Sequence, residues 1–194
     1  MAPKKIIPGN AFWKNVFSER RIHEGSTEEL LSRVPAFSGL APRELKEVAA
    51  IVHKRSYRAG ELVFAQGDPG LGMYIIQEGE VSISLSRKEG DRGELAVLTE
   101  GDFFGEIALL DESPRSANAI CKSDCSLIGF FRPNLFQLIE RKSHLGVKIV
   151  LKLAEIVAQR LRATDGELSK LKGELAHFEM RSERRPSDRT TRKR

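Results

Sequence analysis

The stretch FFGEIALLDESPRSANAI, residues 103–120, holds the side chains with the clearest chemistry in this sequence. Arg115 follows Pro114, which restricts the backbone, and its planar guanidinium offers two parallel donors that suit two phosphate oxygens. Gly105 has no side chain and lets the backbone approach a ligand closely. The short apolar turn that begins near Glu106 would present unpaired amide N–H groups. Such groups attract an anion.

Glu106 needs a different role from Arg115, because a bound phosphate would repel its carboxylate. A carboxylate beside a phosphate site commonly accepts a hydrogen bond from a ribose hydroxyl, as in dinucleotide-binding folds. A phosphate group and a ribose together predict a nucleotide ligand that carries one phosphate or few.

Hydrophobic periodicity and turn residues indicate the elements that position these groups. Ser26 opens a capping box at the start of one helix, and a second helix is expected to begin near Pro42. Between residues 53 and 130, short apolar runs alternate with Gly, Asp and Pro breaks, which predicts many antiparallel strands. One helix is expected from Pro133 and a longer one from about Leu145. The expected fold is mainly β with flanking α: an antiparallel jelly-roll β-barrel, N-terminal helices and a long C-terminal coiled-coil helix.

The long C-terminal helix carries an apolar seam whose members are separated alternately by four and three residues. The seam consists of Val150, Ala154, Val157, Leu161, Thr164, Leu168, Leu171, Leu175 and Phe178. Thr164 is its only polar member. A seam of this kind must be buried, and we expect a parallel homodimer. Packing onto the protein's own barrel is the alternative.

The pattern F-G-E-I-A-L-L-x3-P-R-S-A resembles the phosphate-binding cassette of the cyclic-nucleotide-binding domain family. That family includes the catabolite activator protein and the regulatory subunits of cyclic-AMP-dependent kinase. The similarity extends over residues 30–161, with the turn GELVFAQGDPG at 60–70 and the run YIIQEGEV at 74–81. One departure is that the stretch between the two C-terminal helices is about one turn longer than in the catabolite activator.

The resemblance implies a set of ligand-binding residues, namely Gly105, Glu106, Ile107, Ala108, Arg115, Ser116, Ile83 and Thr164. Glu106 would meet the ribose 2′-hydroxyl and Arg115 the cyclic phosphate, while Ile83 would supply an apolar wall. Thr164 would contact the purine. Cyclic AMP is the favoured ligand, but Ser116 fits either cyclic AMP or cyclic GMP, so both remain open. No cofactor and no metal are implied.

Four segments are expected along the chain. They are a basic and aromatic leader at 1–25, the cyclic-nucleotide-binding domain at 26–144, the dimerisation helix at 145–180 and a basic disordered tail at 181–194. The leader carries Phe12, Trp13, Val16 and Phe17 on one side of a short helix. This cluster would dock on the protein's own surface, or meet a partner or a membrane. Cys121 and Cys125 are expected to be reduced core thiols in a cytoplasmic protein.

The function expected is that of a ligand-gated sensor that acts on an unidentified protein effector. The sequence shows no Ser/His/Asp set, Walker loop or metal cluster, so we do not expect an enzyme. No winged helix-turn-helix follows the seam helix, so the chain is expected to be a member without that unit and without specific DNA binding. The alternatives are a dimeric structural protein with a vestigial pocket, a cyclic-GMP-specific sensor, and a non-specific nucleic-acid binder that uses the basic tail.

Overall fold

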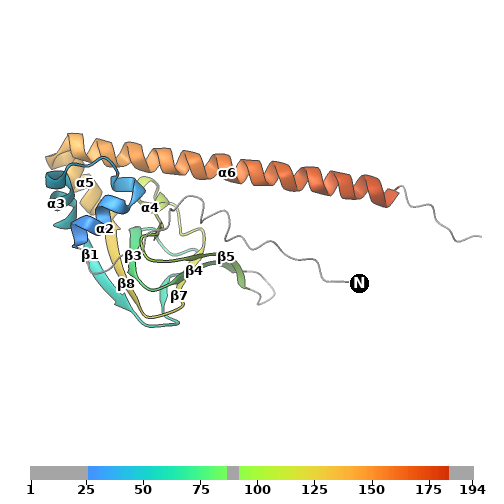
Figure 1. The fold of residues 1–194 in the computed structure, drawn as a ribbon, viewed down its shortest axis with the longest axis horizontal. Helices are drawn as coiled ribbons and strands as arrows, with labels where there is room; N and C mark the ends of the chain where they lie inside the picture. The colour runs from blue at the N-terminus through green and yellow to red at the C-terminus, as the bar shows by residue number, and fades with distance from the viewer. Residues whose placement is uncertain (1–25, 87–91, 184–194) are drawn as a thin grey trace, which may run out of the picture. The chain divides into compact units, whose positions relative to one another are not determined.

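The computed structural model describes residues 26–86 and 92–183 of the chain, and the elements follow the order expected from the sequence (Figure 1). Three short helical segments come first: α2 (Thr27–Arg33), the 3-10 turn η1 (Pro35–Phe37) and α3 (Pro42–Ala49). The predicted start of α2 is confirmed, because the Ser26 hydroxyl accepts a hydrogen bond from the Glu29 amide at 3.3 Å. The aromatic leader and residues 184–194 of the basic tail lie outside the described residues, whereas residues 181–183, predicted to belong to the tail, are the end of a helix.

Eight strands follow. They are β1 (His53–Tyr57), β2 (Leu62–Phe64), β3 (Gly72–Glu78), β4 (Val81–Ser86), β5 (Arg92–Leu98), β6 (Phe103–Phe104), β7 (Asn118–Cys121) and β8 (Cys125–Phe131). They form two four-stranded sheets, β1-β8-β3-β6 and β2-β7-β4-β5, in which neighbouring strands run antiparallel. This strand order is that of a two-sheet jelly roll.

The prediction of a closed barrel is wrong, because the two sheets are separate within the part of the chain that the structure describes. The chain passes from one sheet to the other at tight turns instead of continuing a ladder. Gly60 lies in the turn between β1 and β2, and Gly101 in the turn between β5 and β6, with φ of 85° and 84°. The edge strands β2 and β6 have only three and two residues, too few to close the sheets on each other.

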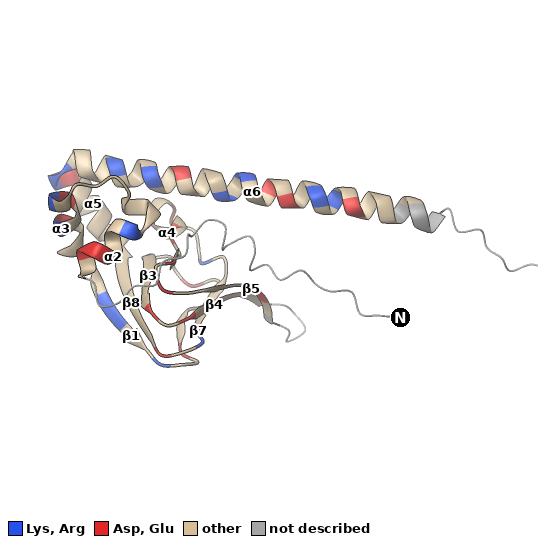
Figure 2. Cartoon of the chain, in the orientation of Figure 1, with Lys and Arg blue, Asp and Glu red and all other residues tan. Residues whose placement is uncertain are grey.

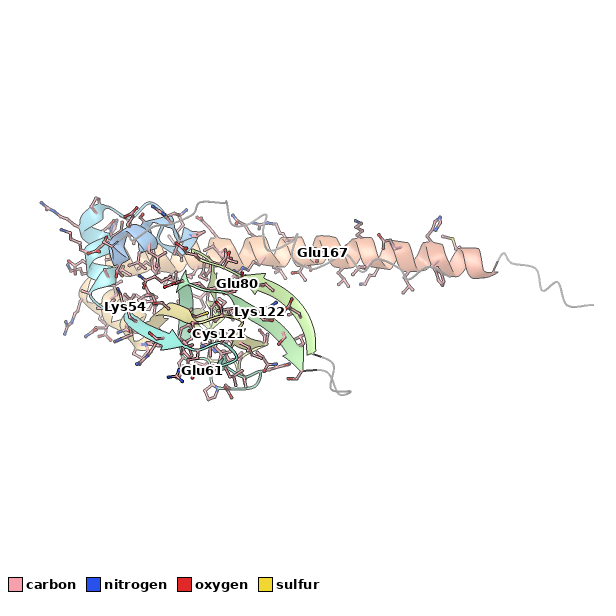
Figure 3. The ribbon with its side chains drawn as sticks, turned by 60° about the horizontal axis from the view of Figure 1, so that its bottom comes forward. Lys54, Glu61, Glu80, Cys121, Lys122 and Glu167 are labelled. Carbon is pink, nitrogen blue, oxygen red and sulfur yellow. The ribbon has the colours of Figure 1, made fainter. Side chains whose placement is uncertain are left out.

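The core lies between the two sheets and takes residues from both. One cluster consists of Ile76, Val81, Ala96, Leu98, Phe104, Ala119, Cys121, Cys125 and Leu127. Cys121 is fully buried among the strands (Figure 3), and its burial raises the pKa of its thiol to about 12. Both cysteines are free, as the sequence predicted.

The described residues contain three further helices: α4 (Ile107–Leu110) lies between β6 and β7, and α5 (Arg132–Arg141) and α6 (Ser143–Glu183) follow β8. The chain divides into two compact units, residues 1–153 and 154–194, so the start of α6 belongs to the first unit. Lys148 of α6 holds the Glu44 carboxylate of α3 at 2.8 Å, and Lys142 pairs with Glu47. Among the described residues, no helix is long and apolar enough to cross a membrane.

The burial pattern of α6 differs from the predicted seam at its first turns. Leu145, Ile149 and Leu153 are buried, whereas Val147 and Leu151 are more than half exposed. Val150, the first predicted seam residue, is half-buried. The pattern arises because the first unit already covers one face of the helix start.

From Leu161 onward, the large apolar residues of α6 form an exposed stripe. Its members are Leu161, Leu168, Leu171, Leu175 and Phe178, with exposed fractions between 49% and 62%. Acidic and basic residues are interspersed along the same helix (Figure 2). A coiled coil through this stripe stays a prediction.

The two faces at the start of α6 should respond differently to truncation. Ile149→Ala removes fully buried atoms and should lower the free energy of unfolding by about 2–5 kcal/mol. Val147→Ala, at a site that is 51% exposed two residues away, should change it by less than about 0.5 kcal/mol. Urea denaturation followed by circular dichroism measures both. Equal effects of the two substitutions would contradict this packing.

Candidate functional site

The segment between β6 and β7 is a short helix anchored at its centre. Ala108 and Leu109 of α4 are buried, whereas Ile107 and Leu110 at its ends are exposed. Gly105 precedes the helix with a φ of 75°, a left-handed conformation that favours glycine. The predicted apolar turn after the strand therefore exists, and its buried residues fix its position in the first unit.

Arg115 lies beneath this turn and is only 8% exposed. Its Nη1 donates to the Gly105 carbonyl at 3.0 Å and its Nη2 to the Gly72 carbonyl at 2.7 Å. The guanidinium also lies over the ring of Phe64, 4.0 Å from the ring centre. The buried Nε has no hydrogen-bond partner within residues 26–86 and 92–183. One donor of a buried cation is thus unpaired, which is costly unless an acceptor reaches it.

The electrostatics of Arg115 reflect two opposing effects. Burial lowers the pKa of its guanidinium, while Tyr74, Glu106 and Asp68 act in the other direction. An arginine keeps its charge under such conditions because its ordinary pKa is above 12. The site therefore contains a permanent cation in partly desolvated surroundings.

A turn at residues 65–68 holds the backbone of Arg115 from both sides. The Arg115 amide donates to the Asp68 carbonyl at 2.8 Å, and the Gly67 amide donates to the Arg115 carbonyl at 2.9 Å. The Asp68 side chain closes the turn by accepting from the Ala65 amide at 2.7 Å. These bonds fix the position from which the guanidinium reaches the cassette.

Glycines allow the close packing around Arg115. A Cβ on Gly105 would lie 2.5 Å from the Arg115 Nη1, and a Cβ on Gly70 would lie 2.8 Å from the Ala108 Cβ. The sequence predicted that Gly105 permits close approach to a ligand. The structure adds a second reason for this glycine, since any side chain would displace the arginine.

The first unit brings several predicted site residues into the same segment. Glu106, only 3% exposed, is close enough to Arg115 to act on its pKa. The Ala108 amide donates to the Gly105 carbonyl at 3.3 Å, and Ile107 and Ser116 are exposed.

Ile83 and Thr164 lie on other elements. Ile83 of β4 is partly buried and packs against the core cluster. Thr164 belongs to the second unit, and its hydroxyl donates to the Arg160 carbonyl one turn earlier at 3.0 Å. The role of each of the predicted residues as a ligand contact stays a prediction.

Three residues around Arg115 were missed by the sequence reasoning. Phe64 supplies the ring under the guanidinium, and Gly72 supplies a backbone carbonyl. Asn118 accepts from the Gln66 amide at 2.8 Å and so supports the turn beside Arg115. An apolar ring and a main-chain oxygen give no signal of their own in a sequence, although Phe64 lies within the 60–70 run and Gly72 follows it closely.

A buried cation with a free donor, next to a buried carboxylate, can bind a ligand that has both an anion and a hydroxyl group. The cation would take the anion, since a charge-assisted hydrogen bond is strong in a desolvated site. The carboxylate can accept from a hydroxyl. This donor and acceptor set fits a sugar phosphate.

Comparison with known proteins identifies the family. Residues 54–142 match the family described as cyclic nucleotide-binding domain. The chain is 37% identical to the cyclic AMP receptor protein of Thermus thermophilus over an alignment of 142 residues. This alignment covers 73% of this chain and 64% of that protein. It is 34% identical over 125 residues to the cAMP-dependent protein kinase regulatory subunit of Aspergillus niger, covering 64% of this chain and 29% of that protein.

The fold agrees with these matches. The crystal structure of the Thermus thermophilus catabolite activator protein aligns with a TM-score of 0.65 and 37% identity, over 71% of this chain and 63% of that one. Residues 54–142 therefore belong to the cyclic-nucleotide-binding domain family. It spans less than two thirds of the length of these relatives.

The packing of Gly105 against Arg115 can be tested by stability. Gly105→Ala should lower the free energy of unfolding by about 1–2 kcal/mol for the left-handed backbone and by about 1–3 kcal/mol more for the displaced arginine. Gly39→Ala is the matched control, because Gly39 has a φ of 80° but open space around it. It should show the backbone cost alone. Thermal denaturation would contradict this packing if both variants lost the same stability.

Proposed function

We propose that this chain is a cyclic-nucleotide sensor, with cyclic AMP as its ligand, that signals to a partner by a ligand-dependent change of conformation. The observation that carries the proposal is the unpaired Nε of the buried Arg115, within a domain of the cyclic-nucleotide-binding family. The names of two relatives, a cyclic AMP receptor protein and a cAMP-dependent kinase regulatory subunit, support the choice of cyclic AMP.

In this proposal Arg115 holds the cyclic phosphate, and its Nε donates to a phosphate oxygen. Glu106 accepts from the ribose 2′-hydroxyl, helped by Gly105. The amides of Ile107, Ala108 and Ser116 surround the phosphate, and Ile83 provides an apolar wall. Thr164 contacts the purine. Arg115 is already held by two carbonyls, so little side-chain freedom is lost when the anion binds.

The alternative of a vestigial pocket is less consistent with the buried charges. Arg115 and Glu106 are both more than 90% buried, and burying charged groups costs free energy that a purely structural site can avoid. A cyclic-GMP-specific sensor differs from the main proposal only in the base that is preferred. Isothermal titration with both nucleotides separates all three functions, since a vestigial pocket takes up neither.

Substitutions at the site should weaken binding by different amounts. Arg115→Lys keeps the positive charge but loses the planar guanidinium with its parallel donors. It should reduce the affinity for cyclic AMP about 10- to 150-fold, the equivalent of about 1.5–3 kcal/mol. Arg115→Ala should abolish measurable binding. Glu106→Ala should weaken binding less, because a ribose hydroxyl can bond to water instead.

Arg55→Ala, an exposed arginine of β1, is the matched control and should titrate like wild type. Each variant is first checked for folding by circular dichroism, because Arg115 also bonds to two main-chain carbonyls. Wild-type affinity in a folded Arg115→Ala protein would contradict the assignment of the site.

The sensor is further proposed to be a parallel homodimer through α6. The support is the exposed stripe of the second unit, where five large apolar side chains are each about half exposed or more. Burying such a stripe against a second copy is the simplest way to remove it from water.

Leu161→Asp combined with Leu168→Asp should convert the dimer into a monomer, since each charge would be buried unpaired in the seam. Light scattering should then report the 21.7 kDa chain instead of twice that mass. Gln159→Asp with Gly166→Asp adds the same charges at the same spacing on a different face and should leave the dimer intact. A monomeric wild type at micromolar concentration would contradict this part of the proposal.

Signalling in this proposal is a population shift. A ligand can move the balance between two conformations only by as much as it binds one of them better, and coupling of about 1–3 kcal/mol is usual. The effector is a protein that recognises one of the two conformations. The chain is proposed to be a non-catalytic cytoplasmic protein without specific DNA binding.

A further inference from the structure

A hollow lies on the first unit, and Arg115 is not among the residues that line it. It has a volume of about 500 Å³ and is lined by Pro69, Gly70, Leu71, Glu112, Arg132, Pro133 and Phe136. We call it the α5 groove, because three of these residues lie at the start of α5. The Arg132 amide donates to the Leu71 carbonyl at 2.9 Å, so the two sides of the groove are fastened together.

The α5 groove is mainly apolar but contains a cation. Leu71 is 63% exposed and Phe136 is 47% exposed, so both offer apolar surface to a segment that covers the groove. The Arg132 guanidinium lies 5.2 Å from the centre of the Phe136 ring and 3.3 Å from the Glu112 carboxylate. Its Nη1 is buried and has no hydrogen-bond partner among the described residues. The groove thus offers apolar surface, one unpaired donor and an exposed carboxylate.

We propose that the α5 groove binds the aromatic leader of this chain through the segment FWKNVF, residues 12–17. The segment has four apolar residues, three of them aromatic, at the spacing of one helix face. Lys14 lies among them and complements the Glu112 carboxylate, while segment carbonyls can accept from the Arg132 Nη1. The leader as a whole carries five basic and two acidic residues, which also suits the exposed Asp111 and Glu112 beside the groove.

The size of the groove and the length of the leader allow this docking. A volume of about 500 Å³ falls within the range of sites that enclose a drug-sized ligand, and so holds one indole and a neighbouring ring. Ser26, where α2 is capped, lies thirteen positions after Trp13, and an extended chain of that length spans roughly 43 Å. A compact unit of this size has a radius of gyration of about 14 Å. The leader is therefore long enough to reach most of the surface of this unit.

Trp13 is the only tryptophan in the chain, so its fluorescence reports the position of the leader directly. In the full-length protein without nucleotide, we expect a blue-shifted emission and weak quenching by acrylamide. Leu71→Asp and Phe136→Ser should each shift the emission to the red and raise the quenching constant several-fold. Both positions are about half exposed or more, so the fold should persist, and circular dichroism checks this.

Leu62→Asp is the matched control, since Leu62 is 49% exposed on β2 and does not line the groove. It should leave the emission of Trp13 unchanged. A wild-type emission typical of indole in water would overturn the proposal. An emission of Trp13 that stays the same in both groove variants would also overturn it. A blue shift that disappears on dilution would also overturn it, because the leader would then bind a second copy. This test needs no ligand, so its outcome is independent of the proposed nucleotide function.

Discussion

The burial of a single guanidinium organises the proposed site. Arg115 is held by the carbonyls of Gly72 and Gly105 and lies over the ring of Phe64, so three separate parts of the chain meet at one side chain. Two of its donors are satisfied by the protein and its Nε is not. A cation fixed in this way needs little reorganisation to receive an anion, which is the physical basis of preorganised recognition.

The jelly roll supplies the constraint that makes this arrangement possible. β6 pairs with β3 at Tyr74 and Ile75, which brings the cassette next to the start of β3 where Gly72 lies. The turn at residues 65–68 then fastens the arginine backbone from the other side. Small residues are required at the contacts, since a Cβ on Gly70 or Gly105 would meet Ala108 or Arg115 at less than 3 Å. The fold thus determines where the charge lies, and the glycines allow the close packing.

Much of this could be predicted from residue types alone. Ser26 predicted the start of a helix, and the Gly and Asp breaks predicted the ends of strands. The cassette predicted that Arg115 and Glu106 are the charged residues of the site. The separation of the two sheets was not visible, because closure depends on hydrogen bonds between edge strands and not on the apolar pattern. The partners of Arg115 were also missed, since main-chain oxygens are present at every residue. On α6, periodicity could not distinguish a face covered by the first unit at Ile149 from one that is exposed at Val147.

In the proposed complex, the Nε of Arg115 donates a hydrogen bond to a phosphate oxygen of the cyclic nucleotide. The most direct measurement is the Nε–Hε cross-peak of Arg115 in a ¹⁵N–¹H NMR spectrum, assigned by its disappearance in Arg115→Lys, during titration with cyclic AMP. A new charge-assisted hydrogen bond should move this cross-peak downfield and saturate together with the binding isotherm measured by calorimetry. A cross-peak that stays in place while cyclic AMP binds would contradict the account.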